Sequence, residues 1–119
     1  MTDLEKLELQ VAQAKPLIEL KDQCLKLQES MSFKAVVEES YFKEEAARLC
    51  MAKSADLNEE SQVIIDRMMY GVGAFKNYLS ACIRRGYDCE QVVEAAEQTR
   101  ADILQEEEDA RIAEENANV

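Results

Sequence analysis

Apolar residues recur at alternating steps of three and four along most of this chain, and this spacing limits the folds that it can adopt. The first such row consists of Leu4, Leu7, Val11, Ala14 and Ile18. Residues three and four apart share one face of an α-helix, whereas a half-buried strand alternates at every second residue. Three Gly and one Pro also supply few of the turn residues that a many-stranded sheet needs. The pattern predicts an all-α protein, a small helical bundle.

A second row has the same spacing but is offset by one residue from the first, and the offset coincides with Pro16. This row consists of Leu17, Leu20, Cys24, Leu27 and Met31. Proline removes a backbone donor and crowds the carbonyl four residues earlier. We therefore expect either one long N-terminal helix kinked at Pro16, or two helices with Pro16 opening the second. Thr2 and Glu5 fit a capping box at the start.

The middle of the chain predicts two further helices. Ser30 or Ser32 can cap the second helix, and Asp56 or Asn58 can cap the third. The apolar row of the second helix is Phe33, Val36, Val37, Tyr41, Ala46, Leu49 and Cys50. The apolar row of the third is Val63, Ile64, Met68, Val72, Phe75, Leu79, Cys82 and Ile83.

A last helix is expected after Gly86, which is well placed to end the third helix. Asp88 and Gln91 resemble a capping box for this last helix, whose apolar face thins out towards its end. We expect residues 1–104 to form a single helical domain. Residues 105–119 are expected to form an acidic tail, either a frayed helix or disordered, because so few apolar groups cannot offset the entropy of ordering it.

Charge excludes several classes of partner. The chain holds 25 acidic and 14 basic residues, a net charge of −11, which repels nucleic-acid phosphates and anionic membranes. The excess is uneven, since residues 102–119 hold seven acidic residues against Arg111 alone. No stretch approaches the roughly 20 apolar residues of a transmembrane helix, and the charged opening lacks a signal-peptide core. We expect no direct nucleic-acid or membrane partner.

Catalytic and metal-binding groups are scarce. The chain has no histidine, which removes the commonest general base and the commonest metal ligand. Its four cysteines contain no CxxC pair, so we expect neither a zinc site nor any cofactor. In a reducing compartment, Cys24, Cys50 and Cys82 are most simply small buried hydrophobic residues. We expect the protein not to be an enzyme.

Two short motifs have alternative interpretations. Gly71 and Gly73 each cost about 1 kcal/mol relative to alanine inside a helix. Close approach of a neighbouring helix would explain them, and a hinge or a partner contact is the alternative. Arg84 and Arg85 either bind a phosphate or an acidic partner, or occupy a helix C-terminus where positive charge is favourable.

Candidate partner-binding residues belong to the apolar rows, the arginine pair and the acidic tail. The opening row packs against the chain's own third helix or mediates self-association. The tail is a solvated end, an arm that docks on a basic protein, or a mimic of nucleic-acid charge, for which its carboxylates must be held rigidly. The candidates are Leu4, Leu7, Val11, Leu17, Leu20, Leu27, Arg84, Arg85, Glu106, Glu107 and Glu108.

A family resemblance extends from Phe33 to Leu79 and is most specific in the stretch YFKEEAARL. The residues that carry it are Phe33, Lys34, Val36, Val37, Tyr41, Phe42, Glu45, Ala46, Arg48, Leu49, Gly73, Phe75 and Tyr78. With its leucine-rich start and glutamate-rich end, the chain resembles a family of small acidic helical proteins encoded by tailed bacteriophages. The resemblance implies a phage origin and a host-cytoplasm or virion setting, and it implies no particular activity.

The most specific stretch also has a simple physical explanation. In a helix, Glu45 and Arg48 can pair on one face while Phe42, Ala46 and Leu49 face inward. We interpret this arrangement as a structural clamp rather than a binding site.

Two functions remain as hypotheses. The first is a phage virion or assembly factor that docks on a phage structural protein or forms a homo-oligomer through its N-terminal helix. The second is a host-takeover inhibitor that blocks a host DNA-handling or defence enzyme with its acidic surface, by charge mimicry in one version. The first follows from the apolar rows and the resemblance, the second from the net charge of −11.

Overall fold

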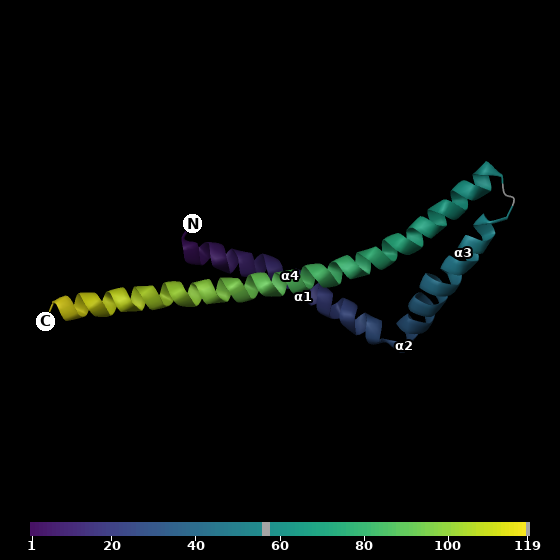
Figure 1. The fold of residues 1–119 in the computed structure, drawn as a ribbon. Coiled ribbons are helices and arrows are strands. Elements are labelled where there is room, and N and C mark those ends of the chain that lie inside the picture. The colour runs from purple at the N-terminus through teal and green to yellow at the C-terminus, as the bar shows by residue number, and fades with distance from the viewer. Residues whose placement is uncertain (56–57, 119) are drawn as a thin grey trace. The chain divides into compact units, whose positions relative to one another are not determined.

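The computed structural model describes residues 1–55 and 58–118, and most of these lie in helices (Figure 1). In chain order the elements are α1 (Asp3–Glu29), α2 (Met31–Phe33), the π-helix η1 (Lys34–Glu45), α3 (Ala46–Lys53) and α4 (Glu59–Ala117). No strand occurs in the described part of the chain. The protein is all-α, as the spacing of its apolar residues predicts.

Side-chain caps open α1, α2 and α4. The hydrogen bonds run from the Glu5 amide to Thr2 Oγ1 (3.1 Å), from the Phe33 amide to Ser30 Oγ (3.4 Å) and from the Ser61 amide to Asn58 Oδ1 (2.8 Å). The expected cap at Thr2 is confirmed, and of the paired alternatives the structure uses Ser30 and Asn58. Asp56, the other candidate for α4, lies outside the described residues.

Helix α1 continues through Pro16, so the two-helix alternative is wrong. Its inward row does not shift at the proline but keeps its steps of three and four. The buried and half-buried residues of this row are Leu4, Leu7, Val11, Ala14, Ile18, Lys21, Leu25 and Gln28. Pro16 itself is exposed, and the helix therefore keeps one stripe inward throughout. In the second row, Cys24 is buried whereas the four residues Leu17, Leu20, Leu27 and Met31 are exposed.

Helix α4 runs through Gly86, so the predicted stop there and the capping box at Asp88 and Gln91 are wrong. A glycine closes a helix by adopting positive φ, and no described residue does so. Gly86 is buried and belongs to the inward row of α4, which is Leu79, Cys82, Gly86, Cys89, Val93 and Ala96. The helix also passes the expected boundary at residue 104 and continues to Ala117, so this segment is helical.

Contacts divide the chain into two compact units, unit 1 (Met1–Glu19 with Arg85–Val119) and unit 2 (Leu20–Arg84). In unit 1 the start of α1 runs antiparallel to the second half of α4 (Figure 1). Leu7 and Val11 line one pocket together with Ala96, and Leu7 lines another together with Thr99. The opening row therefore packs against the chain itself, but against the segment expected as the last helix. The buried apolar side chains of this unit are those of Ala14 and Ala96.

Unit 2 has a larger core. A buried cluster of Cys24, Phe33, Leu79 and Cys82 is joined by Val37, Phe42 and Ile83. The rings of Tyr41, Phe42 and Phe75 lie 5.7–6.3 Å apart, which places η1 against α4. Leu49 is 1% exposed, and Lys53 Nζ pairs with Asp66 Oδ1 at 2.5 Å.

The π-helix changes which residues of the predicted second helix face inward. Phe33, Val37, Phe42 and Ala46 are spaced by four, five and four residues, which matches the roughly 4.4 residues per turn of a helix with i→i+5 bonds. The wider turn keeps all four on one side. Val36, predicted from α-helical spacing to face inward, is 65% exposed instead.

Candidate protein-binding groove

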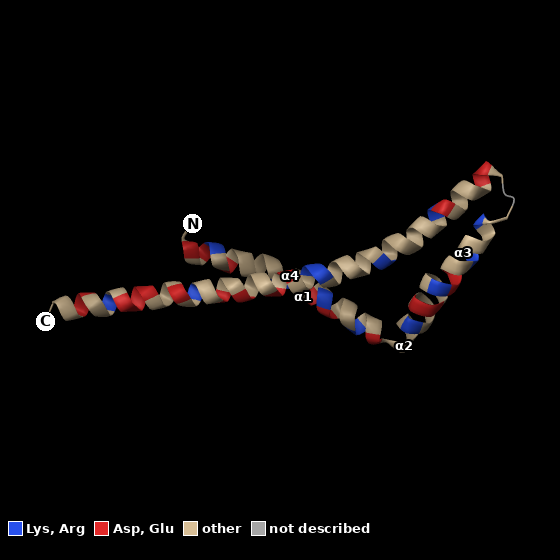
Figure 2. Ribbon diagram, viewed as in Figure 1, with Lys and Arg blue, Asp and Glu red and all other residues tan. Residues whose placement is uncertain are grey.

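An apolar groove of about 580 Å³ lies on unit 2 between α1 and α4. Its lining residues are Leu20, Gln23, Cys24, Lys26, Leu27, Ser30, Phe75, Tyr78 and Leu79. Cys24 and Leu79 are buried and lie at its base, whereas Leu20, Leu27 and Tyr78 are exposed. In Figure 2 this part of α4 carries few charged residues. We refer to this feature as the groove.

Beside the groove, α1 buries a lysine and exposes leucines, the opposite of what hydrophobicity favours. Lys21 is 4% exposed and lies in the inward row, while Leu20 and Leu27 are 39% and 45% exposed. Lys21 Nζ contacts Asp22 Oδ1 at 3.2 Å. Lysine is rarely buried, and exposed leucines that adjoin aromatic rings form the kind of apolar patch that marks interaction sites. The face of α1 that carries the exposed residues Leu20 and Leu27 is therefore a candidate interface.

The groove also has a distinct electrostatic character. Lys26 is the charged residue in its lining, and no Asp or Glu is among the lining residues. Lys26 forms no ion pair with any residue that the structure describes. An apolar groove with one exposed cation suits an apolar ligand surface that carries negative charge at its edge.

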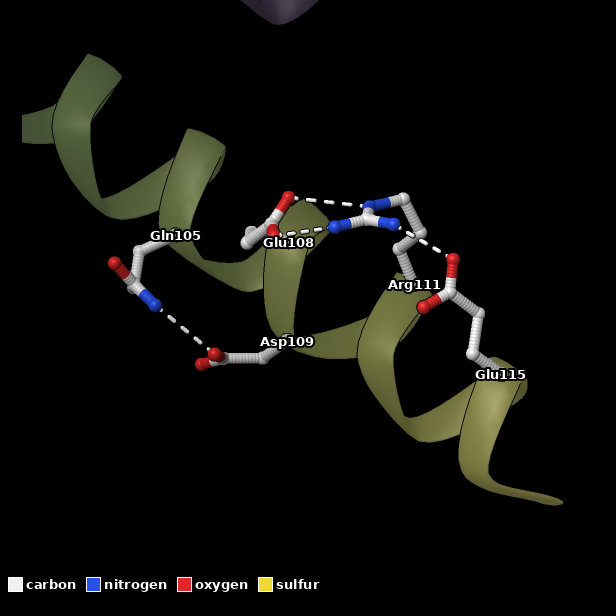
Figure 3. Close-up of polar contacts among 5 residues, drawn as sticks. All are labelled: Gln105, Glu108, Asp109, Arg111 and Glu115. Atoms are coloured by element: carbon white, nitrogen blue, oxygen red, sulfur yellow. Dashed lines mark hydrogen bonds and ion pairs between the residues drawn. The ribbon is translucent and has the colours of Figure 1, made fainter. Parts of the chain in front are cut away.

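The end of α4, residues 104–117, is the acidic segment. All its side chains are exposed, and it holds six acidic residues against Arg111 (Figure 2). Figure 3 shows Arg111 between two carboxylates: Nη1 donates to Glu115 Oε1 at 2.7 Å and Nε donates to Glu108 Oε2 at 3.2 Å. Gln105 Nε2 donates to Asp109 Oδ1 at 2.9 Å. Pairs at these spacings support the helix, so the carboxylates sit in a helical array.

The pKa of Arg111 is raised, first by its hydrogen bond to Glu108 and also by that to Glu115. An arginine guanidinium is charged throughout the physiological pH range, so both hydrogen bonds are charge-assisted. Glu106 and Glu107 are exposed on the same helix.

The predicted partner-binding residues lie in different environments. Leu4, Leu7 and Val11 are half-buried in unit 1, and Leu7 and Val11 line a pocket that α1 shares with α4. Leu17 is exposed, and two other candidates, Leu20 and Leu27, line the groove.

Arg84 and Arg85 are exposed in the middle of α4, so the explanation that they occupy a helix C-terminus is wrong. The reason is that α4 does not end at Gly86. The groove also contains two aromatic residues that sequence reasoning missed as site residues, Phe75 and Tyr78. Their spacing of three, which puts both on one helix face, is the signal that could have identified them.

Gly71 and Gly73 do not mark a close approach of a neighbouring helix. A Cβ built on Gly73 meets nothing within 4 Å, and one on Gly71 lies 3.8 Å from Tyr41 Oη, an ordinary contact. The close-approach explanation is therefore wrong for Gly73. The alternatives of a hinge or a partner contact stay predictions.

The cysteines divide into two groups. Cys24 and Cys82 are buried as predicted, but Cys50 is exposed on α3 because its neighbour Leu49 takes the inward position. Burial raises the pKa of the Cys24 thiol, and the adjacent Cys82 thiol raises it further. A protonated, buried thiol is chemically inert, which fits a packing role.

The predicted pairing of Glu45, the last residue of η1, with Arg48 of α3 is confirmed, and its interpretation as a structural clamp rather than a binding site stays a prediction. Arg48 Nε donates to Glu45 Oε2 at 2.9 Å, and Arg48 Nη2 donates to the second carboxylate oxygen. These hydrogen bonds lower the pKa of Glu45. Ala46 and Phe42 are half-buried, and Leu49 is buried.

Among the described residues, no helix is long and apolar enough to cross a membrane. Comparison of the chain with protein-family models, with curated protein sequences and with solved structures finds no match.

Proposed function

We propose that this chain is a non-enzymatic phage protein, a virion or assembly factor, that acts by binding another protein. The single observation that carries the proposal is the groove, where leucines and aromatic rings are exposed while Lys21 is buried. A chain of this size normally hides its large apolar side chains, so a partner that covers them is the simplest explanation. The absence of histidine and the resemblance of residues 33–79 to phage proteins support it.

The setting that fits this function is the virion or the host cytoplasm during assembly, with a phage structural protein or a second copy of this chain as the partner. Particles purified from infected cells by density gradient and probed with an antibody to this chain should contain it. A phage that carries Leu27→Asp should incorporate less of the protein. Leu9→Asp is the matched control, because Leu9 is also on α1 and is also 45% exposed but lies outside the groove. Protein found only in the cytosol, and never with particles or structural proteins, would contradict the proposal.

A second candidate function rests on the acidic segment. Carboxylates carried on an exposed helix, two of them paired with Arg111, support a host-takeover inhibitor that binds a DNA-handling or defence enzyme, by charge mimicry of nucleic acid in one version. Its binding would weaken steeply with salt and would be lost when residues 102–119 are deleted. Binding that is indifferent to both changes would reject this candidate.

A further inference from the structure

Two surfaces of this chain lack a covering partner and have opposite chemistry. The groove is apolar, is lined by Lys26 and contains no carboxylate. The acidic segment has six acidic residues and a fully exposed helical surface. The two surfaces are complementary. The groove carries a cation and no carboxylate, so it suits an apolar ligand with negative charge at its edge, as the acidic segment has.

The acidic segment also offers apolar anchors. Leu104 and Ile112 are 45% and 43% exposed on this otherwise polar segment. They are eight positions apart in the sequence, which is about two turns of an α-helix and brings both to one side of α4. A helix with apolar anchors one or two turns apart is the form of ligand that apolar grooves between helices bind.

We propose that the acidic segment of one copy of this chain docks in the groove of a second copy. Leu104 and Ile112 pack against the exposed leucines and aromatic rings of the groove, and the flanking carboxylates face Lys26. The inference rests on the proposed function, since it names the contact by which an assembly factor would associate.

The two contacting surfaces are different, so the contact is heterologous. Each copy presents one groove and one acidic segment, and association continues until a ring closes or an open array forms. A symmetric contact of groove with groove is disfavoured because it would bring two copies of Lys26 together without a carboxylate in the lining.

Complementation between two defective variants tests this directly by sedimentation velocity over a range of concentration. Leu27→Asp damages the groove, and the double change Leu104→Asp with Ile112→Asp damages the segment. Wild type should self-associate, either as a dimer in which each segment occupies the other copy's groove or as a larger ring or open array, and each variant alone should remain monomeric. An equimolar mixture of the two variants should form a dimer and nothing larger, because one intact groove and one intact segment remain.

Two controls separate the contact from effects on folding. Leu9→Asp should assemble like wild type, and all variants should keep the wild-type circular dichroism spectrum. Lys26→Glu, an exposed change, should weaken association by at least about tenfold at low salt, whereas Lys15→Glu on the same helix should not.

Two results would overturn the inference. One is a wild-type protein that stays monomeric at high micromolar concentration, and the other is a segment variant that still dimerises alone. A monomeric chain that nevertheless copurifies with particles would overturn this inference and leave the proposed function standing. A chain that assembles as described but never associates with particles would support this inference and contradict the proposed function.

Discussion

Unit 1 and unit 2 are built from the same helices but differ in charge and in core. Unit 1 holds fifteen acidic and five basic residues, whereas unit 2 holds ten and nine. All three Phe and three of the four Tyr are in unit 2. The buried apolar side chains of unit 1 are those of two alanines, while unit 2 buries Phe33, Leu49, Val72 and Leu79.

The difference indicates separate roles for the two units. Alanines allow two helices to approach closely but remove little apolar area from water. The helix pairing in unit 1 therefore contributes little hydrophobic stabilisation. The aromatic core of unit 2 supplies most of the apolar burial and also supports the groove. Unit 2 is therefore the stable part of the molecule, and the acidic end of unit 1 should open first.

The largest expected effect concerns the core of unit 2. Leu49→Ala should lower the free energy of unfolding by about 2–5 kcal/mol, because it leaves a cavity at a site that is 1% exposed. Leu9→Ala in unit 1 should change it by no more than about 0.5 kcal/mol. Urea unfolding followed by circular dichroism measures both. Equal losses would break the comparison, because the two units would then contribute alike.

An intermediate effect of opposite sign is expected at Gly73. Gly73→Ala should raise the free energy of unfolding by about 1 kcal/mol, since alanine is the better helix former and its Cβ meets nothing within 4 Å. Ala74→Gly, at the exposed neighbouring position, should lower it by a similar amount. If Gly73→Ala were destabilising, the glycine would have to serve as a hinge or in a contact that the isolated chain makes.

The smallest effect is electrostatic and compares the arginine clamps of the two units. Hydrogen bonds from Arg48 lower the pKa of Glu45 in the fold, so this pair stabilises fully above the ordinary pKa of glutamate. Its contribution is lost as the pH falls through the lowered pKa. In Arg48→Gln the pKa of Glu45 should return to its ordinary value, as measured by carboxyl titration in NMR. Arg111→Gln in unit 1 should leave the Glu45 titration unchanged.

Local sequence rules predicted much of the fold. The inward row that begins at Leu4, the caps at Thr2 and Asn58, and the clamp of Glu45 and Arg48 each depend on residues within four positions of one another. Helical geometry alone fixes which such residues meet, so the spacing was sufficient.

The predictions that were wrong share one cause, because each depended on contacts with residues that are distant in the sequence. A glycine is a helix stop or a row member depending on what packs beside it, and Gly86 proved to be a row member. Val36 turns outward because η1 is wound as a π-helix that packs on α4, and α-helical spacing gives no sign of this.

The groove shows the same difference between what local spacing predicts and what depends on contacts that are distant in the sequence. Leu20 and Leu27 are visible in the sequence as an apolar row, but so is the row that begins at Leu4, and nothing local ranks one above the other. The sequence by itself determined that the chain is helical, acidic and without histidine, since these properties depend on composition and on neighbours along the chain. Only the tertiary structure decided which apolar row is covered, because burial depends on residues that lie far away in the sequence.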